Sequence, residues 1–166
     1  YEWVTQFGHI GLLDAYLKRA ALGEMPPANH VLLAPRAKVA NHSYLAYYDD
    51  RLCIVRDTAL VDALFPWQRC FGEGFMVTRG EHGRAEPWVR AAARAQITWA
   101  KDGRLPLLAL KPDDHARGRA ALAALGLPED ALYVGLHVRE SGFHAETTDG
   151  FSAHRNARIQ DCIPAI

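Results

Sequence analysis

Short apolar runs alternate along this chain with longer stretches of helical periodicity, and this alternation constrains the fold more than any other feature. The runs lie at residues 3–5, 30–33, 52–55 and 133–138. Short runs that are apolar on both faces are typical of strands in a parallel sheet covered by helices. The sequence therefore predicts an α/β fold, a Rossmann-like parallel sheet with helices on both faces.

The segments between these runs carry apolar residues at the spacing of helices. The three longest predicted helices cover residues 12–22, 86–101 and 113–125, with Gly23 and Gly126 just past the ends of the first and last. Asp113 or Asp114 is expected to cap the third helix. Shorter helices are predicted near residues 41–48, 60–64 and 155–166, and a further strand near 75–78. Pro66 is expected to stop the helix that begins near residue 60.

Length and composition fit a globular protein. The chain has 166 residues, of which 49% are hydrophobic, enough for one domain of ordinary size with a real core. Nineteen basic residues balance nineteen acidic residues. No overall field therefore draws the protein to nucleic acid or to an anionic membrane, and any recognition of anions must be local.

The cysteines and the chain ends bear on location. Cys53, Cys70 and Cys162 are widely spaced and form no pair, so neither a disulfide framework nor a zinc knuckle is predicted. No window approaches the roughly 18 to 20 apolar residues that cross a bilayer. We expect a cytoplasmic protein without a transmembrane segment here. The chain starts without Met and ends in helical sequence, so we expect a fragment whose missing regions supply any peripheral contact with the inner membrane.

The run at residues 133–138 ends in polar residues. In a strand, alternate side chains share a face, so His137 and Arg139 point to the same side near the strand's carboxyl end. Open α/β folds bind ligands at that edge of the sheet. Arg139 suits a phosphate, and His137 can donate a hydrogen bond or carry a proton. Backbone N–H groups at Ser141 and Gly142 can face the same anion.

A structural interpretation of this pair stays open. His137 and Arg139 can also mark the exit of the strand from the core, with Arg139 paired to a carboxylate. The pattern H-x-R is short, so alone it does not decide between the two interpretations.

Other candidate residues also have two interpretations. Gly8, His9 and Gly11 follow the first apolar run and form either a loop facing a cleft, with His9 as a base or acceptor contact, or a turn that caps the next helix. Asp113-Asp114-His115 is similar to a phosphoesterase motif, but its place before an alanine-rich stretch favours capping. The spacing of His137, His144 and His154 matches no metal-ligand pattern, and no Asp-x-Asp motif occurs, so no metal is predicted.

Longer stretches carry a family resemblance. "YVGLHVRESGFH", followed by "HRNARIQDCIPAI", resembles a group of bacterial glycosyltransferases in which a strand ending in "HVR" with Glu or Asp precedes a loop and an "RNA-x-I" helix. "FGHIGLLDAYLKRAALG" resembles that group's first loop and helix, and "RAALAALGLPEDALYVGLHVRE" resembles its lead-in, whereas residues 59–111 match loosely. More distantly, H-x-R is similar to the H-x-R-R peptide of α-1,6-fucosyltransferases and protein O-fucosyltransferases, with Glu140 in place of the second Arg.

This resemblance implies a GT-B architecture of two Rossmann-like domains, of which the chain is the amino-terminal half. Residues 1–128 would form the amino-terminal, acceptor-side domain and residues 129–166 the truncated start of the donor-binding domain. The implied reaction transfers a sugar from a nucleotide-diphosphate-sugar donor to a glycan or cell-surface polysaccharide acceptor, with no cofactor or metal.

The implied roles follow the matched motifs. Arg139, with Ser141 and Gly142, would bind the donor phosphate, because sugar transfer needs positive charge where the leaving phosphate gains negative charge. His9 and His137 would be the catalytic residues. The list of cleft residues comprises Gly8, Gly11, Arg155 and Asn156, although Asn156 can instead cap the last helix. A non-catalytic α/β binding or scaffold module stays open as an alternative, and a phosphoesterase as a third.

Overall fold

We describe a computed structural model of residues 2–71, 77–79, 84–138 and 157–163. The chain divides into two compact units, Tyr1–Leu110 and Lys111–Ile166. This division falls earlier than residue 129, where the sequence predicts a second domain to begin. That domain boundary stays a prediction, and each unit is described below by itself.

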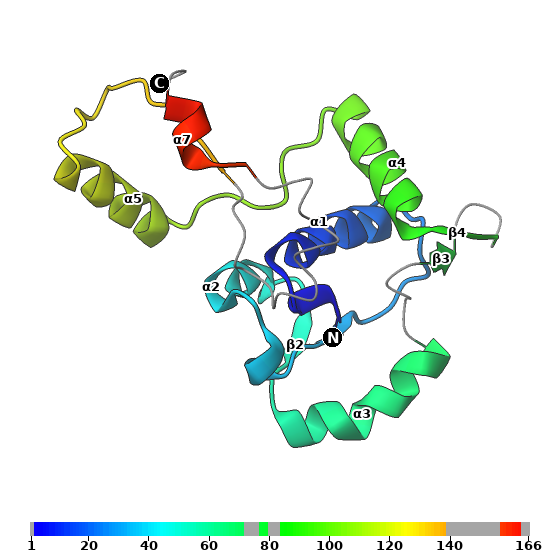
Figure 1. The fold of residues 1–166 in the computed structure, drawn as a ribbon. Coiled ribbons are helices and arrows are strands. Elements are labelled where there is room, and N and C mark those ends of the chain that lie inside the picture. The colour runs from blue at the N-terminus through cyan, green and yellow to red at the C-terminus, as the bar shows by residue number, and fades with distance from the viewer. Residues whose placement is uncertain (1, 72–76, 80–83, 139–156, 164–166) are drawn as a thin grey trace. The chain divides into compact units, whose positions relative to one another are not determined.

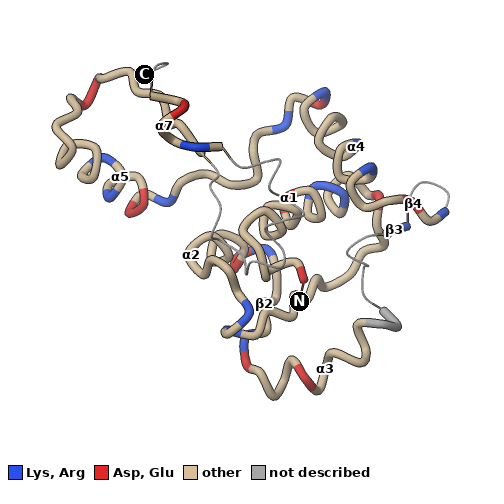
Figure 2. The backbone as a smooth tube through the Cα atoms, in the orientation of Figure 1, with Lys and Arg blue, Asp and Glu red and all other residues tan. Residues whose placement is uncertain are grey.

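The first unit is mixed α/β (Figure 1). Its elements are η1 (Glu2–Val4), α1 (Phe7–Ala21), β1 (Val31–Leu33), η2 (Arg36–Lys38), α2 (His42–Leu45), η3 (Ala46–Tyr48), β2 (Cys53–Val55), α3 (Thr58–Phe71), β3 (Val77–Arg79), β4 (Ala85–Pro87) and α4 (Trp88–Lys101). Basic and acidic residues are spread over these elements (Figure 2), in keeping with the balanced net charge.

Two pairs of strands are present in the described part of the chain. β1 and β2 are parallel, with Val31 opposite Cys53 and Leu33 opposite Val55, and the connection between them carries η2, α2 and η3. β3 and β4 form an antiparallel hairpin. The strands predicted near residues 30–33 and 52–55 and their parallel pairing are confirmed. In the described residues each sheet has two strands, so the wider Rossmann-like sheet remains a prediction.

The core of this unit forms where α1 packs on α4. Ile10 and Leu13 of α1 are buried together with Trp88 and Ala92 of α4. The Trp3 ring meets the Trp88 ring edge to face, with 4.7 Å between centroids. Such aromatic pairs add to the free energy gained from burying their area. This packing holds the first and last helices of the unit together.

Two helix ends of the first unit show clear capping. The Asn41 side chain accepts a hydrogen bond from the Tyr44 backbone N–H at 2.8 Å and so caps α2. Beyond α1, Gly23 has a φ of 75°, and the N–H of Glu24 donates to the Arg19 carbonyl at 3.0 Å. Because few residues other than glycine adopt such a positive φ, Gly23 ends α1 as the sequence predicts. The turn also brings Glu24 back beside Arg19.

The start of the chain differs from the prediction. Residues 2–4 form a 3-10 helix instead of a strand, with Trp3 and Val4 buried. The helix α1 begins at Phe7, so Gly8 and Gly11 lie inside a helix and form neither a loop nor a turn. Two glycines cost roughly 1 kcal/mol each in a helix. Burial of Ile10 and Leu13 offsets that cost.

Pro66 does not end a helix either, since α3 runs through it to Phe71. A proline removes one backbone hydrogen bond and strains the turn before it. The predicted helix at residues 86–101 is confirmed except that Glu86 belongs to β4 and α4 begins at Trp88.

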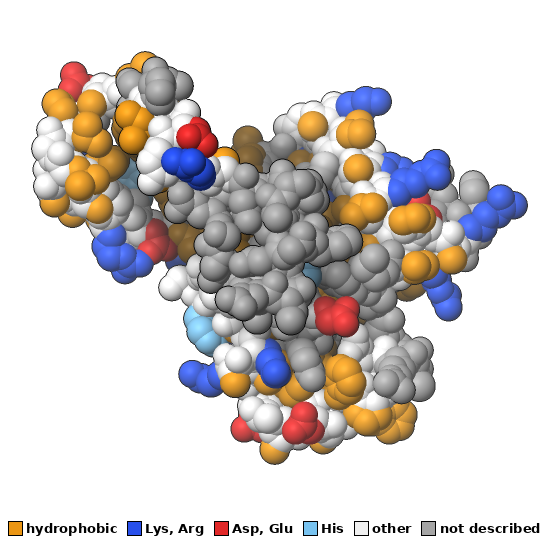
Figure 3. All heavy atoms as spheres, viewed as in Figure 1, with side chains coloured by type: hydrophobic (Ala, Val, Ile, Leu, Met, Phe, Trp, Pro, Cys, Tyr) orange, Lys and Arg blue, Asp and Glu red, His pale blue; other side chains and the backbone are white. Residues whose placement is uncertain are grey.

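The second unit contains α5 (Pro112–Ala124) and α7 (Ile159–Cys162). Hydrophobic side chains lie on the surface of α5 (Figure 3). Lys111 is the N-cap of α5, and Asp113 and Asp114 lie inside its first turn, where the helix dipole favours carboxylates. The prediction that either aspartate is the cap residue was therefore wrong. Gly126, with a φ of 79°, ends the helix as predicted.

The segment at residues 133–138 is not a strand in this structure. Leu132 and Val134 are 97% and 89% exposed, and no described residue of the second unit pairs with them as a neighbouring strand. A strand needs such a neighbour to satisfy its backbone groups.

Among the described residues, no helix is both long and apolar enough to cross a membrane.

Candidate functional site

His9, which the resemblance makes catalytic, lies in the first turn of α1. It is half-buried, and its Nδ1 is 3.0 Å from the Glu2 carbonyl oxygen. A carbonyl only accepts, so Nδ1 carries the proton of this hydrogen bond. A base role for His9 would therefore fall to Nε2. Gly8 is exposed beside it, and the Cβ that an alanine would place at Gly11 is 3.5 Å from Tyr44 Oη.

The remaining predicted site residues belong to the second unit. His137 is exposed in the irregular segment before residue 139. The donor-phosphate residues Arg139, Ser141 and Gly142 and the cleft residues Arg155 and Asn156 lie outside the described residues. The structure therefore brings together only Gly8, His9 and Gly11, on one helix.

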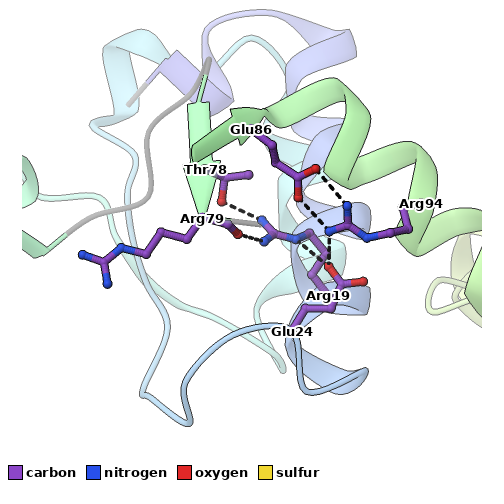
Figure 4. A network of polar contacts seen from close by, with 6 residues as sticks. All are labelled: Arg19, Glu24, Thr78, Arg79, Glu86 and Arg94. Atoms are coloured by element: carbon purple, nitrogen blue, oxygen red, sulfur yellow. Dashed lines mark hydrogen bonds and ion pairs between the residues drawn. The ribbon is translucent and has the colours of Figure 1, made fainter. Parts of the chain in front are cut away.

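A cluster of charged residues that the sequence did not predict joins α1 to α4 and to the β3–β4 hairpin. We call it the Arg19 cluster, and its members are Arg19, Glu24, Thr78, Glu86 and Arg94 (Figure 4). The Arg19 side chain is fully buried and donates three hydrogen bonds: from Nε to Glu24 at 3.0 Å, from Nη1 to Thr78 Oγ1 at 2.8 Å, and from Nη2 to the Arg79 carbonyl at 2.7 Å.

Arg94 completes the cluster from the side of α4. Its guanidinium donates to both carboxylate oxygens of Glu86, at 2.9 and 2.7 Å, and to Glu24 at 3.1 Å. Hydrogen bonding to Glu86 raises the pKa of Arg94, and in return the Arg94 guanidinium lowers the pKa of Glu86. Two cations and two carboxylates thus balance one another.

The ring of Trp88 closes the cluster below Arg19. The guanidinium carbon of Arg19 is 5.0 Å from the centroid of that ring, close enough for a cation–π interaction. Each hydrogen-bonding nitrogen of Arg19 has a partner within the protein. The hydrogen bonds of the Arg19 guanidinium consequently hold the hairpin against α1 and α4.

A second polar group lies farther along the same two helices. Lys18 Nζ is 2.7 Å from Asp14 and 2.7 Å from the Gln96 side-chain oxygen, and the Gln96 amide donates to Asp14 at 2.8 Å. Lys18 Nζ also lies 5.6 Å from the Trp99 ring centroid. These three side chains satisfy one another, so this group too stabilises the α1–α4 packing.

The second unit has an open groove along α5. It has a volume of about 510 Å³, and His115, Arg119, Leu127 and Tyr133 are among its lining residues. Glu129, also in the lining, pairs with Arg119. Of the predicted site residues that the structure describes, none lines this groove. Within the described ranges, no group of three or more His, Cys, Asp or Glu residues could hold a metal ion.

Sequence patterns offered no signal for the Arg19 cluster. Arg19 and Glu24 are separated by five positions and Glu86 and Arg94 by eight, and neither spacing places two side chains side by side on a helix. Comparison of the chain with protein-family models, with curated proteins and with solved structures gave no match.

Proposed function

We propose that the chain is part of a metal-independent GT-B glycosyltransferase, which transfers a sugar from a nucleotide-diphosphate sugar to a glycan or cell-surface polysaccharide. The observation that carries the proposal is the peptide His137-Val138-Arg139-Glu140 together with the "RNARI" stretch at residues 155–159. Both resemble the corresponding stretches of bacterial glycosyltransferases, in the same order.

The parallel pairing of β1 and β2 supports this proposal. The 19 residues between Leu33 and Cys53 include a helix, and they bring the chain back so that β2 runs parallel to β1. The crossover units of Rossmann-like domains have the same connection. A GT-B enzyme has such a domain on the acceptor side. The wider sheet and the second domain belong to the proposal.

The proposed chemistry needs positive charge at the leaving group. As the bond between the sugar and the diphosphate breaks, negative charge grows on the phosphate oxygens, and a fixed cation stabilises it. Arg139 has this role, and Ser141 and Gly142 add backbone N–H groups. His137 orients the donor or contacts the acceptor.

A base would be needed on the acceptor side. The acceptor hydroxyl loses a proton as it attacks the sugar, and a histidine is the side chain that most often takes such a proton. We assign this role to His9 Nε2, because Nδ1 already donates to the Glu2 carbonyl. The same hydrogen bond fixes the orientation of the imidazole ring.

Release of nucleoside diphosphate from UDP- and GDP-sugars by the full-length protein, with a glycan acceptor present, tests this function. We expect His9→Gln to lower the rate about 100-fold or more, the usual contribution of a general base. His42→Gln is the matched control, because His42 is exposed on α2. Equal rates for the two variants would remove His9 from the mechanism, and no release from any donor would contradict a transferase.

A non-catalytic α/β binding or scaffold module is the second candidate. The described charge clusters are compatible with it, since Arg19, Lys18 and their partners act within the fold. Such a module would bind no nucleotide sugar. Titration with donors therefore separates the two candidates.

A further inference from the structure

One surface of the first unit combines exposed aliphatic side chains with cations that form no salt bridge with any residue the structure describes. It extends over the β3–β4 hairpin and the outer side of α4. We call it the basic apolar surface, and its residues are Val77, Arg79, Arg84, Val89, Arg90, Ala93, Ile97 and Lys101, all exposed. Figure 3 shows basic and hydrophobic side chains gathered over this part of the molecule.

The hairpin contributes through its outward face. Thr78 is buried and binds Arg19, so Val77 and Arg79, its neighbours in the strand, point the other way. In Figure 4 the Arg79 side chain extends away from the Arg19 cluster, to which Arg79 contributes only its carbonyl. The Arg19 cluster thereby fixes which side of the hairpin faces outward.

The helix α4 contributes through the side opposite the core. Trp88, Ala92, Ala95 and Trp99 are buried against the rest of the unit. Arg90, Ala93, Ile97 and Lys101 follow at intervals of three and four residues on the opposite side, and Ile97 is 56% exposed. Val89, at the edge of this stripe, is 70% exposed. The helix therefore presents an apolar strip with a cation at each end.

The cations on this surface differ from several others in the described part of the chain. Arg56, Arg104, Arg117 and Arg119 each pair with an acidic residue. Among the described residues, Arg79, Arg84, Arg90 and Lys101 form no such salt bridge, and α4 itself contains no Asp or Glu. The Arg90 guanidinium acts on Glu86 only as a more distant charge. These four described cations therefore lie beside the aliphatic side chains without an acidic partner of their own.

We propose that this surface docks the protein on an anionic lipid membrane. Aliphatic side chains enter the interfacial region of a bilayer while flanking Lys and Arg side chains meet anionic headgroups. Aliphatic residues between the cations suit lipid better than single-stranded nucleic acid, whose bases stack on aromatic side chains. The inference goes beyond the proposed transferase activity, because docking needs neither a donor nor an acceptor.

Co-sedimentation with vesicles tests the inference. The full-length protein would be mixed with vesicles of phosphatidylcholine alone and with vesicles that also contain phosphatidylglycerol. We expect binding to the anionic vesicles, weakened by salt. Replacing both Arg90 and Lys101 by Gln should lower the partition coefficient on the order of 20-fold, since each cation near an anionic surface contributes about fivefold.

The matched control replaces Arg36 and Lys38 by Gln, because both are exposed cations outside this surface and the change in net charge is the same. It should retain binding. The double variant with Val89→Ser and Ile97→Ser should also bind the vesicles more weakly than the unmodified protein. This difference should remain at high salt. The inference would be overturned if the protein did not bind anionic vesicles or if the control variant lost as much binding. It would also be overturned if α4 bound an acidic protein and no vesicles. Donor titration is independent of all these outcomes.

Discussion

Arg19 Nη1 donates a hydrogen bond to Thr78 Oγ1 at 2.8 Å, and this contact joins α1 to β3 across 59 positions of sequence. Both side chains are buried, so neither can exchange its partner for water. A buried guanidinium is tolerated only when its donors and charge are satisfied. The position of the β3–β4 hairpin thus depends on Arg19.

Replacing Arg19 by Met should lower the free energy of unfolding by about 3–5 kcal/mol, because Glu24 loses one of its two cations and Thr78 its donor. Urea denaturation followed by circular dichroism measures this change. Arg36→Met, at an exposed position, is the control and should change stability by no more than about 0.5 kcal/mol. Equal losses in both variants would show that the cluster does not stabilise the fold.

The free energy of unfolding should also depend on pH through Glu86. The Arg94 guanidinium holds the Glu86 pKa below its ordinary value of 4.5, so the folded state favours the carboxylate. The stabilisation is present above about pH 4.5 and is lost as the pH falls through the lowered pKa. Glu86→Gln should remove this dependence, whereas Glu129→Gln, at an exposed pair, should leave it in place. Identical acid denaturation curves for Glu86→Gln and the unmodified protein would contradict this reading.

Tyr48 should resist ionisation at alkaline pH. Burial, and after it the neighbouring Tyr44 hydroxyl, raises the Tyr48 pKa well above its ordinary value of 10.0. The raised pKa stabilises the fold below about pH 10, and this contribution is lost as the pH rises further. Ultraviolet titration should show one of the six tyrosines ionising only when the protein unfolds. Tyr48→Phe should remove that late step, and an unchanged titration would rule out Tyr48 as its source.

Gly11→Ala distinguishes the observed helix from the predicted loop. Within α1, alanine should raise the free energy of unfolding by about 0.5–1 kcal/mol, since its Cβ makes only an ordinary contact of 3.5 Å with Tyr44 Oη. Gly23→Ala is the opposite control, because a φ of 75° disfavours alanine and should cost about 1 kcal/mol. A loss of stability in Gly11→Ala would favour a loop that needs glycine.

Local signals predicted the elements whose causes are local. The Gly23 and Gly126 helix ends and the apolar runs that became β1 and β2 depend on neighbouring residues, and each is present. The predicted local structure was wrong where tertiary packing determines the backbone conformation. Gly8 and Gly11 look like a turn, yet Ile10 and Leu13 between and beyond them are buried and hold the helix.

In the candidate site, too, the sequence predicted what depends on local signals and missed what depends on packing. His9 was predicted from its place after an apolar run, and the structure adds the hydrogen bond that fixes its tautomer. The Arg19 cluster had no signal, because its partners come from four separate elements that meet only after folding. The run at residues 133–138 has the pattern of a strand but, in the described residues, no neighbouring strand to complete it.

Donor binding tests the proposed transferase most directly. Isothermal titration of the full-length protein with UDP- and GDP-sugars would compare Arg139→Ala with Arg117→Ala, an exposed arginine on α5. We expect one donor class to bind, and Arg139→Ala to weaken it by about 30-fold or more, as when a charged hydrogen bond to phosphate is lost. Arg117→Ala should leave the affinity unchanged. Equal donor affinity in Arg139→Ala and the unmodified protein would contradict the phosphate role, and no binding of any donor would contradict the transferase itself.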